Sequence, residues 1–375
     1  MLPLHRSNAR LGLDINNVMI VQFLPVVALF VSLGLCLNAE VVGERLGVMA
    51  RPDGARKTHT KPTPQIGGVA ILTGFVIWLI GALLVPGQIS SDPLLLAILL
   101  TAGGLGIVGF VDDRHEIPPL SRILMLLVFA GAAFALDPQL ISPTLNWQSF
   151  APTPIPAWAY LPLMAVTIVG VVNAVNMADG QNGLVGGMFV VWSACLALVS
   201  NGTLALMAAM MCALCMVFLF FNLRGKMFLG DCGSYGVTFV IGLMVTLAHA
   251  RGEVSLETVI VWFFVPVMDC LRLMVTRKLQ GRSPFEGGRD HFHHRLMDSI
   301  GGRRSAGIYI AAVALSSLCA TLAPRFALVF LCVLSGFYFS FARLSEGEGR
   351  SRHADADDKK DAKIVSMSGH VRERK

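Results

Sequence analysis

The stretch PLLLAILLTAGGLGIVGFV, residues 93–111, decides the fold class, because it carries no charge along its length and is followed at once by Asp112 and Asp113. A helix that crosses the hydrocarbon core of a bilayer needs about 20 mostly apolar residues. The apolar residues are continuous here and do not alternate with polar ones, as they would in a half-buried strand. The stretch therefore predicts a membrane-spanning helix with two carboxylates at its end.

Similar apolar stretches recur along the whole chain. Of the 375 residues, 54% are hydrophobic and only 14% are charged, with a mean hydropathy of +0.66, whereas about 25% of a soluble domain is charged. In lipid, only helices and closed barrels satisfy every backbone hydrogen bond. We therefore predict an all-α, polytopic helical membrane protein with about 11 transmembrane helices. The expected spans are 18–37, 65–85, 93–111, 121–136, 158–175, 184–200, 203–221, 235–249, 256–275, 306–322 and 325–342.

The lysines and arginines set the expected orientation. Most of them lie in the loops that follow odd-numbered spans or in the C-terminal tail, and few lie on the other side. Loops rich in Lys and Arg face the cytoplasm. We therefore expect the N-terminus outside, the C-terminus in the cytoplasm, and the ends of the odd-numbered spans on the cytoplasmic face.

Two regions follow from composition. Residues 1–342 form a membrane-embedded domain, and residues 343–375 mix basic and acidic side chains with almost no large apolar residues. Such a segment cannot bury enough surface to fold alone. We expect it to be a disordered, charged cytoplasmic tail.

Acidic and amide side chains stand at the ends of two more spans. Asn173, Asn176 and Asp179 are spaced to share one helical face, and polar groups inside a membrane usually mark a functional site. The alternative for the amides is simple packing between helices.

Adjacent carboxylates such as Asp112 and Asp113 raise each other's pKa unless a cation lies between them, so a divalent metal is expected. A solvated helix end remains the alternative for that pair.

The stretch FLGDCGS, residues 228–234, is predicted to begin a helix near Asp231. Free backbone amides at a helix N-terminus bind anions, and a carboxylate beside them fits Mg²⁺ that bridges carboxylate and phosphate oxygens. An ordinary N-cap by Asp231 or Ser234 is the alternative.

A histidine-rich loop follows the ninth span, with the sequence SPFEGGRDHFHHR at residues 283–295. Its histidines and arginines suit a phosphate or nucleotide, and no matching cysteine or carboxylate spacing supports a closed zinc site. The loop after the first span, RKTHTK at residues 56–61, can add positive charge toward a diphosphate.

Together these motifs resemble one family, the polyprenyl-phosphate N-acetylhexosamine-1-phosphate transferases. Five motifs follow one another in the family's order over about residues 45–300, namely RKTHTKPTPQIGG, GFVDD, NAVNMADGQNG, FLGDCGS and SPFEGGRDHFHHRL. The spaced pattern of His291, His293 and His294 resembles the branch that uses simple N-acetylhexosamines, as in undecaprenyl-phosphate GlcNAc-1-phosphate transferases. The branch that forms lipid I is similar but usually carries consecutive histidines.

The resemblance implies a reaction and a set of residues. N-acetylhexosamine-1-phosphate, with GlcNAc as the expected sugar, would pass from a UDP-sugar to undecaprenyl phosphate and release UMP, as the first lipid-linked step of a cell-surface glycan. Mg²⁺ is the expected cofactor, with Mn²⁺ as an alternative. The implied catalytic residues are Asp112, Asp113 and Asp179, and the implied metal ligands are Asn176 and Asp231. The implied substrate-binding residues are Lys57, His59, Asn173, Asn182, Arg289, His291, His293 and His294.

The chain departs from the family's pattern at two positions, which keeps other functions open. Asn182 and Gly288 stand where the family commonly has aspartates. These two departures suggest a non-catalytic lipid-binding homologue as one alternative. A cation- or proton-coupled transporter, with the acidic residues as an ion path, is the other. The expected partners are undecaprenyl phosphate, a UDP-N-acetylhexosamine and the membrane, with no nucleic acid and the oligomeric state left open. The expected location is the bacterial inner membrane, with the active site on its cytoplasmic face.

Overall fold

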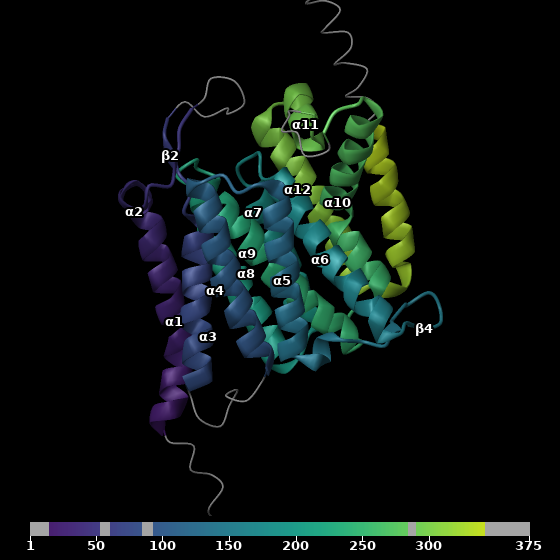
Figure 1. Cartoon of the computed structure of the whole chain (residues 1–375), viewed down its shortest axis with the longest axis horizontal. Coiled ribbons are helices and arrows are strands. Elements are labelled where there is room, and N and C mark those ends of the chain that lie inside the picture. Colours follow the sequence, from purple (N-terminus) through teal and green to yellow (C-terminus); the bar gives the residue numbers. More distant parts are fainter. Residues whose placement is uncertain (1–14, 53–60, 85–92, 284–289, 342–375) are drawn as a thin grey trace, which may run out of the picture.

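The computed structural model describes residues 15–52, 61–84, 93–283 and 290–341, which form a bundle of helices (Figure 1). The helices are α1 (Ile15–Leu37), α2 (Ala39–Leu46), α3 (Gly67–Leu84), α4 (Pro93–Arg114), α5 (Pro119–Leu136), α6 (Ala157–Ala178), α7 (Leu184–Val199), α8 (Gly202–Asn222), α9 (Gly230–Ala250), α10 (Leu256–Leu279), α11 (Phe292–Ile300), α12 (Gly302–Leu322) and a final helix (Pro324–Phe341), with the 3-10 turns η1 (Pro138–Leu140) and η2 (Pro324–Phe326). The prediction of an all-α polytopic membrane protein is confirmed.

Two short antiparallel ladders lie outside the helices. β1 (Met49–Ala50) pairs with β2 (Thr63–Pro64), with Met49 opposite Pro64. β3 (Thr144–Leu145) pairs with β4 (Thr153–Pro154), with Thr144 opposite Pro154. Each ladder joins two segments of connecting chain and adds no layer to the helical bundle.

Each predicted apolar span overlaps a helix of the described residues, with differences at the ends of some spans. Within those residues, 9 helices are long and apolar enough to cross a membrane. A tenth span results if the part Phe23–Leu37 of α1 and the helix α2 count as one, although they meet at a 78° bend. α7 is apolar but shorter. The number of crossings and their direction stay predictions.

Local chemistry explains where the helices begin. α5 starts at Pro119, and proline suits the first turn because an amide there needs no partner within the helix. α10 starts after Ser255, whose hydroxyl accepts a hydrogen bond from the Thr258 amide at 3.4 Å. α9 starts at Gly230, earlier than the span predicted from residue 235. The predicted span counted only apolar residues, whereas the helix also includes the polar residues Asp231 and Ser234 in its first turns.

α9 is the central helix of the bundle. In its apolar window 94% of the residues are buried, and it packs against α3, α4 and α6. The contact with α4 is close at Gly109, where a Cβ atom would lie 2.4 Å from the carbonyl oxygen of Asp231. This packing brings the acidic end of α4 to the first turn of α9.

Elements distant in sequence meet at one end of the bundle. α2, β2 and α11 lie at that end, whereas β4 lies at the opposite end (Figure 1). The C-terminal ends of α4 and α6 and the first turn of α9 belong to the same end, as their contacts described below require. The compartment that this end faces stays a prediction. The predicted tail at 343–375 lies outside the described residues.

Candidate active site

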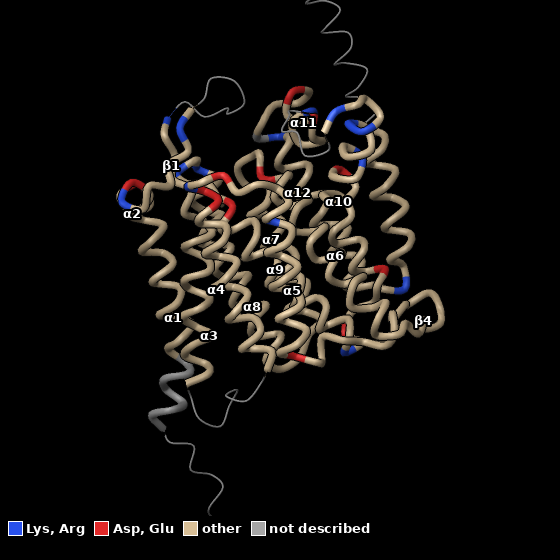
Figure 2. The backbone as a smooth tube through the Cα atoms, viewed as in Figure 1, with Lys and Arg blue, Asp and Glu red and all other residues tan. Residues whose placement is uncertain are grey.

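The acidic residues at the end of α4 and the first turn of α9 form one polar centre. Figure 2 shows charged residues gathered at the end of the bundle that carries α2, β1 and α11, with a few at the opposite end. The centre of the site is Asp113. Its Oδ1 accepts hydrogen bonds from the Asp231 amide at 2.8 Å and from Gln65 Nε2 at 3.3 Å, and its Oδ2 accepts one from the Cys232 amide at 3.1 Å.

These hydrogen bonds correct the prediction for the N-terminus of α9. Two of the amides expected to bind a substrate phosphate are already bound to the carboxylate of Asp113, because α4 brings that side chain to the positive end of the helix dipole. No cap by Asp231 or Ser234 is formed at this helix start. The first turn is therefore already occupied, by a carboxyl group of the protein itself.

The predicted metal pair, Asn176 and Asp231, is in direct contact. The Asn176 amide nitrogen donates to Asp231 Oδ1 at 2.6 Å and to Ser234 Oγ at 2.9 Å. Because α6 ends at Ala178, Asn176 lies in its last turn, facing α9. The amide oxygen of Asn176 and the carboxylate of Asp231 are both oxygen donors of the kind that Mg²⁺ prefers.

Asp112 lies beside this centre but faces other partners. Its Oδ2 accepts a hydrogen bond from the Tyr235 hydroxyl at 2.7 Å and lies 3.4 Å from Arg122 Nε. Its Oδ1 accepts one from the Ile117 amide at 2.7 Å. These contacts fix the turn between α4 and α5, so Asp112 has a clear structural role, and its predicted catalytic role stays a prediction.

Asp179 follows α6 directly and is partly buried. Burial and the nearby carboxylate of Asp231 raise the pKa of Asp179 to about 7. A carboxyl group has a raised pKa when neither solvent nor a nearby cation stabilises its negative charge. A divalent cation between these carboxylates would supply that stabilisation, so the residues present fit Mg²⁺ by their donor atoms and by their charge.

The histidine motif reaches the same end of α6. A Cβ atom on Gly180 would lie 2.4 Å from His293 Nε2 and 3.1 Å from His294 Nε2. His293 is 2% exposed, and its Nε2 has no hydrogen-bond partner within the described chain. Burial, with the neighbouring His294 and His291 rings, lowers the pKa of His293 to about 3. A pKa this low favours the neutral form of the His293 imidazole at physiological pH.

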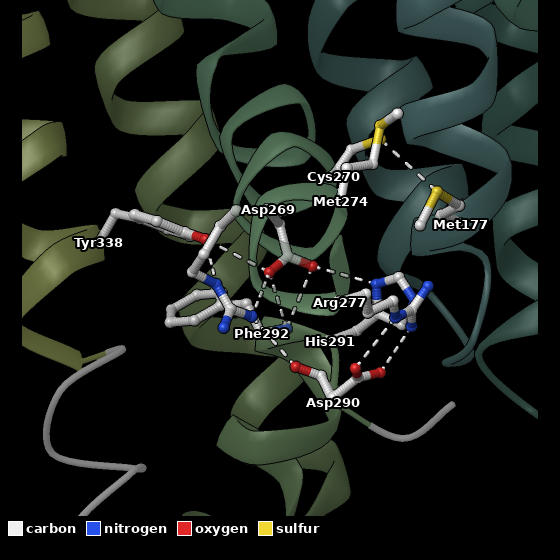
Figure 3. A network of polar contacts seen from close by, with 10 residues as sticks. Met177, Asp269, Cys270, Met274, Arg277, Asp290, His291, Phe292 and Tyr338 are labelled. Atoms are coloured by element: carbon white, nitrogen blue, oxygen red, sulfur yellow. Dashed lines mark hydrogen bonds and ion pairs between the residues drawn. The ribbon is translucent and has the colours of Figure 1, made fainter. Parts of the chain in front are cut away.

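Asp269 in α10 is a site residue that the sequence analysis missed. It is 4% exposed, and its Oδ2 lies 3.2 Å from His291 Nδ1 (Figure 3). Asp269 could have been found from the sequence, because it is a carboxylate inside a predicted apolar span, and ionisable residues in such spans are usually functional. Its neighbour Cys270 contacts Met177 of α6 at 3.5 Å, between the two sulfur atoms. α6 and α10 are thereby joined next to Asn176.

The other predicted residues are less central or lie outside the described chain. Asn173 donates to the Val169 carbonyl oxygen of its own helix at 2.8 Å. Asn182 is exposed, and its Nδ2 lies 3.5 Å from the position that a Cβ atom on Gly225 would occupy. The residues outside the described ranges are Lys57, His59, Gly288 and Arg289.

A profile of glycosyl transferase family 4 matches residues 95–249, a range that includes Asp113, Asn176 and Asp231. The chain is 28% identical over 327 residues to an undecaprenyl-phosphate alpha-N-acetylglucosaminyl 1-phosphate transferase of Salmonella typhi, covering 81% of this chain and 85% of the relative. The chain is therefore similar to this family of transferases. The resemblance inferred from the motifs, to the polyprenyl-phosphate N-acetylhexosamine-1-phosphate transferases, is confirmed.

Two further relatives have the same kind of name. The transferase is 29% identical over 323 residues to the undecaprenyl-phosphate alpha-N-acetylglucosaminyl 1-phosphate transferase of Escherichia coli K12. The match covers 81% of this chain and 85% of the relative. It is 29% identical over 303 residues to a decaprenyl-phosphate N-acetylglucosaminephosphotransferase of Mycobacterium tuberculosis H37Rv. This match covers 68% of this chain and 70% of the relative. The transferase is therefore a membrane-embedded enzyme, as predicted from its motifs.

Proposed function

We propose that the transferase moves N-acetylglucosamine-1-phosphate from UDP-N-acetylglucosamine to undecaprenyl phosphate, releasing UMP. The product would be undecaprenyl-diphosphate-N-acetylglucosamine, the first lipid-linked intermediate of a cell-surface glycan. The observation that carries the proposal is the contact of Asn176 with Asp231, beside Asp113 and close to the histidines at Gly180. The names of the relatives support the sugar and the lipid.

The reaction needs positioning more than acid–base chemistry. An oxygen of the lipid phosphate forms a bond to the sugar-linked phosphorus, the bond from that phosphorus to the UMP oxygen breaks, and its electron pair leaves with UMP. A phosphate monoester has its second pKa near about 6, so the nucleophile is largely dianionic at neutral pH and no strong base is required. The protein's task is to align the two substrates and to limit charge repulsion between them.

We propose Mg²⁺ as the cofactor, with Mn²⁺ as an alternative. Asp231 and Asn176 would hold the metal, with Asp179 close enough to add charge. When bound, the metal would neutralise charge on the diphosphate of the donor. Asp113 would fix the first turn of α9, and thereby the direction in which Asp231 points.

The outer surface of the helices that flank Asp112 suits a long isoprenoid tail. The large apolar side chains of α5 that are exposed include Leu120 at 69% and Val128 at 69%. A lipid whose tail stays in the bilayer could thus present its phosphate at the polar end of α4. We place this end on the cytoplasmic face of the bacterial inner membrane, because the basic loops gather there.

One assay tests the proposal directly. Purified protein in detergent is given undecaprenyl phosphate and a panel of UDP-sugars, with and without Mg²⁺, and UMP is measured. Release of UMP with UDP-N-acetylglucosamine, dependent on both Mg²⁺ and the lipid, is expected. Lipid binding without UMP release from any donor would identify a non-catalytic homologue. Substrate accumulation in sealed vesicles without UMP would identify a transporter.

A further inference from the structure

The start of α11 is attached to one face of α10 by a set of charged side chains. Arg272 and Arg277 follow Asp269 by three and eight residues in α10, so around the helix axis Asp269 lies between the two arginines. Their partners are Asp290, His291 and Phe292, the residues that lead into the histidine motif (Figure 3). Three consecutive residues are therefore each held by this helix.

Asp269 makes most of these contacts. Its carboxylate accepts hydrogen bonds from the Phe292 amide at 3.0 Å and 3.1 Å, and its Oδ2 lies 3.2 Å from His291 Nδ1. On the other side, Arg272 Nη2 donates to its Oδ1 at 2.9 Å, and the Tyr338 hydroxyl does so at 3.3 Å. Since the carboxylate only accepts, the contact with His291 places the imidazole proton on Nδ1.

Asp290, the residue before His291, is also held by side chains of α10. Arg277 is 1% exposed and donates to both carboxylate oxygens of Asp290, at 2.6 Å and 3.1 Å. Arg272 donates to the Asp290 carbonyl oxygen at 3.0 Å. Two-pronged contacts of this kind fix orientation as well as distance. These contacts therefore fix the orientation of the chain at Asp290, just before α11 begins.

That orientation decides where the histidines point. His291 and His293 stack with their ring centroids 5.5 Å apart, and His293 and His294 have theirs 4.2 Å apart. The Nε2 atoms of His293 and His294 face Gly180, next to Asp179 at the end of α6. Attachment of the loop to α10 thus sets the position of imidazoles that lie beside the acidic centre.

We infer that Asp269 is a positioning residue of the transferase: through His291 and the Phe292 amide it orients the histidine motif toward the nucleotide-sugar at the end of α6. This inference rests on the proposed function. It adds a residue from α10, outside the matched range 95–249, to the machinery that binds the donor substrate.

A metal ion is the competing explanation for the same residues. Ligand atoms of Asp269, His291 and His293 lie within 4.8 Å of one another. However, both oxygens of Asp269 already accept hydrogen bonds from the protein, and one of them faces the nitrogen of His291. A metal would have to displace these donors, whereas a positioning role uses all of them. The contacts therefore favour positioning.

The test compares two buried carboxylates on the same helix. Glu257 is 0% exposed and accepts hydrogen bonds from the Gln148 and Ser149 amides near the start of α10. It lies 12 residues, or about 18 Å along the helix, from Asp269. Glu257→Gln therefore removes the same charge and a similar set of contacts far from the histidines, and serves as the matched control for Asp269→Asn.

Both variants are assayed as full chains in detergent with Mg²⁺ and undecaprenyl phosphate, and their melting temperatures are measured in parallel. Asp269→Asn is expected to raise KM for UDP-N-acetylglucosamine at least about tenfold, with KM for the lipid unchanged and kcat within about twofold, as for lost ground-state binding. UMP binding, followed by calorimetry, should weaken to a similar extent. Glu257→Gln should keep the wild-type KM for the sugar nucleotide, whatever its melting temperature.

A double-mutant cycle with His291→Ala tests whether Asp269 acts through the histidine. If it does, Asp269→Asn in the His291→Ala background adds less than about twofold to KM. Fully additive effects would overturn the inference, as would equal KM values in Asp269→Asn and Glu257→Gln. One zinc per chain in the wild type, lost in Asp269→Asn, would overturn it in favour of a metal site. A wild type that releases no UMP would instead contradict the proposed function itself.

Discussion

At the scale of single residues, two carboxylates that are close together have different tasks. Asp113 is occupied by the two amides at the start of α9, whereas the Asp231 carboxylate accepts a hydrogen bond from Asn176. The first stabilises the fold of the site, and the second is the residue to which the proposed function assigns the metal. Two acids that lie close together in space therefore need not share one function.

Asp231→Ala is expected to abolish Mg²⁺-dependent UMP release, by at least about 100-fold, while the protein stays folded. In the wild type Mg²⁺ should raise the melting temperature in detergent, because a cation relieves the charge among Asp113, Asp179 and Asp231. The variant should lose this stabilisation. Glu44→Ala, an exposed carboxylate in α2, is the control and should keep both properties. Normal turnover of Asp231→Ala at matched expression would exclude its metal role.

At the scale of elements, the site depends on how closely helix ends approach. α4 reaches the first turn of α9 at Gly109, and α11 reaches the end of α6 at Gly180. Neither contact leaves room for a side chain. The helices are thus held near enough for short polar side chains to meet across them.

Gly109→Ala is expected to lower both the melting temperature and the activity, since its Cβ atom would lie 2.4 Å from the backbone oxygen of Asp231, which cannot move without α9. Overpacking of this kind usually costs about 1–3 kcal/mol. Gly103→Ala in the same helix has nothing within 4 Å and is the control. Thermal unfolding in detergent measures the difference. Equal melting temperatures of the two variants would refute the close contact between α4 and α9.

Gly180→Ala tests the contact between the α6 end and the histidines. The added methyl group would lie 2.4 Å from His293 Nε2, and the buried ring has little room to withdraw. We expect a higher KM for UDP-N-acetylglucosamine and a melting temperature within a few degrees of the wild type. Gly170→Ala lies within α6, with nothing within 4 Å of the added Cβ atom, and should have the wild-type KM. An unchanged KM in Gly180→Ala would separate the histidines from the donor site.

At the scale of the whole molecule, the sequence predicted the helices well because hydrophobicity is a local property. The apolar stretches and the position of Asp231 at a helix start are both found in the structure. The capping of α9 by Asp113 and the contact of Asp269 with His291 could not be predicted. Both join residues far apart in sequence, and only the packing of α4, α9, α10 and α11 brings them together.

The arrangement predicts which parts of the surface share a compartment. Single cysteines placed at Glu44 in α2 and Asp298 in α11, in a background without the eight native cysteines, should react with a membrane-impermeant thiol reagent from the cytoplasmic side only. A cysteine at Gln148, near β3, should react from the opposite side. Labelling of residues 44 and 298 from opposite sides would rule out a common site for the helix ends.

The enclosure of α9 has a consequence for how the enzyme meets its surroundings. Because other helices surround it on nearly every side, bilayer thickness and acyl-chain composition act first on the outer helices. The depth at which Asp231 sits is set by protein neighbours. We therefore expect turnover to vary little between short-chain and long-chain lipid nanodiscs, even where the outer helices tilt to match them.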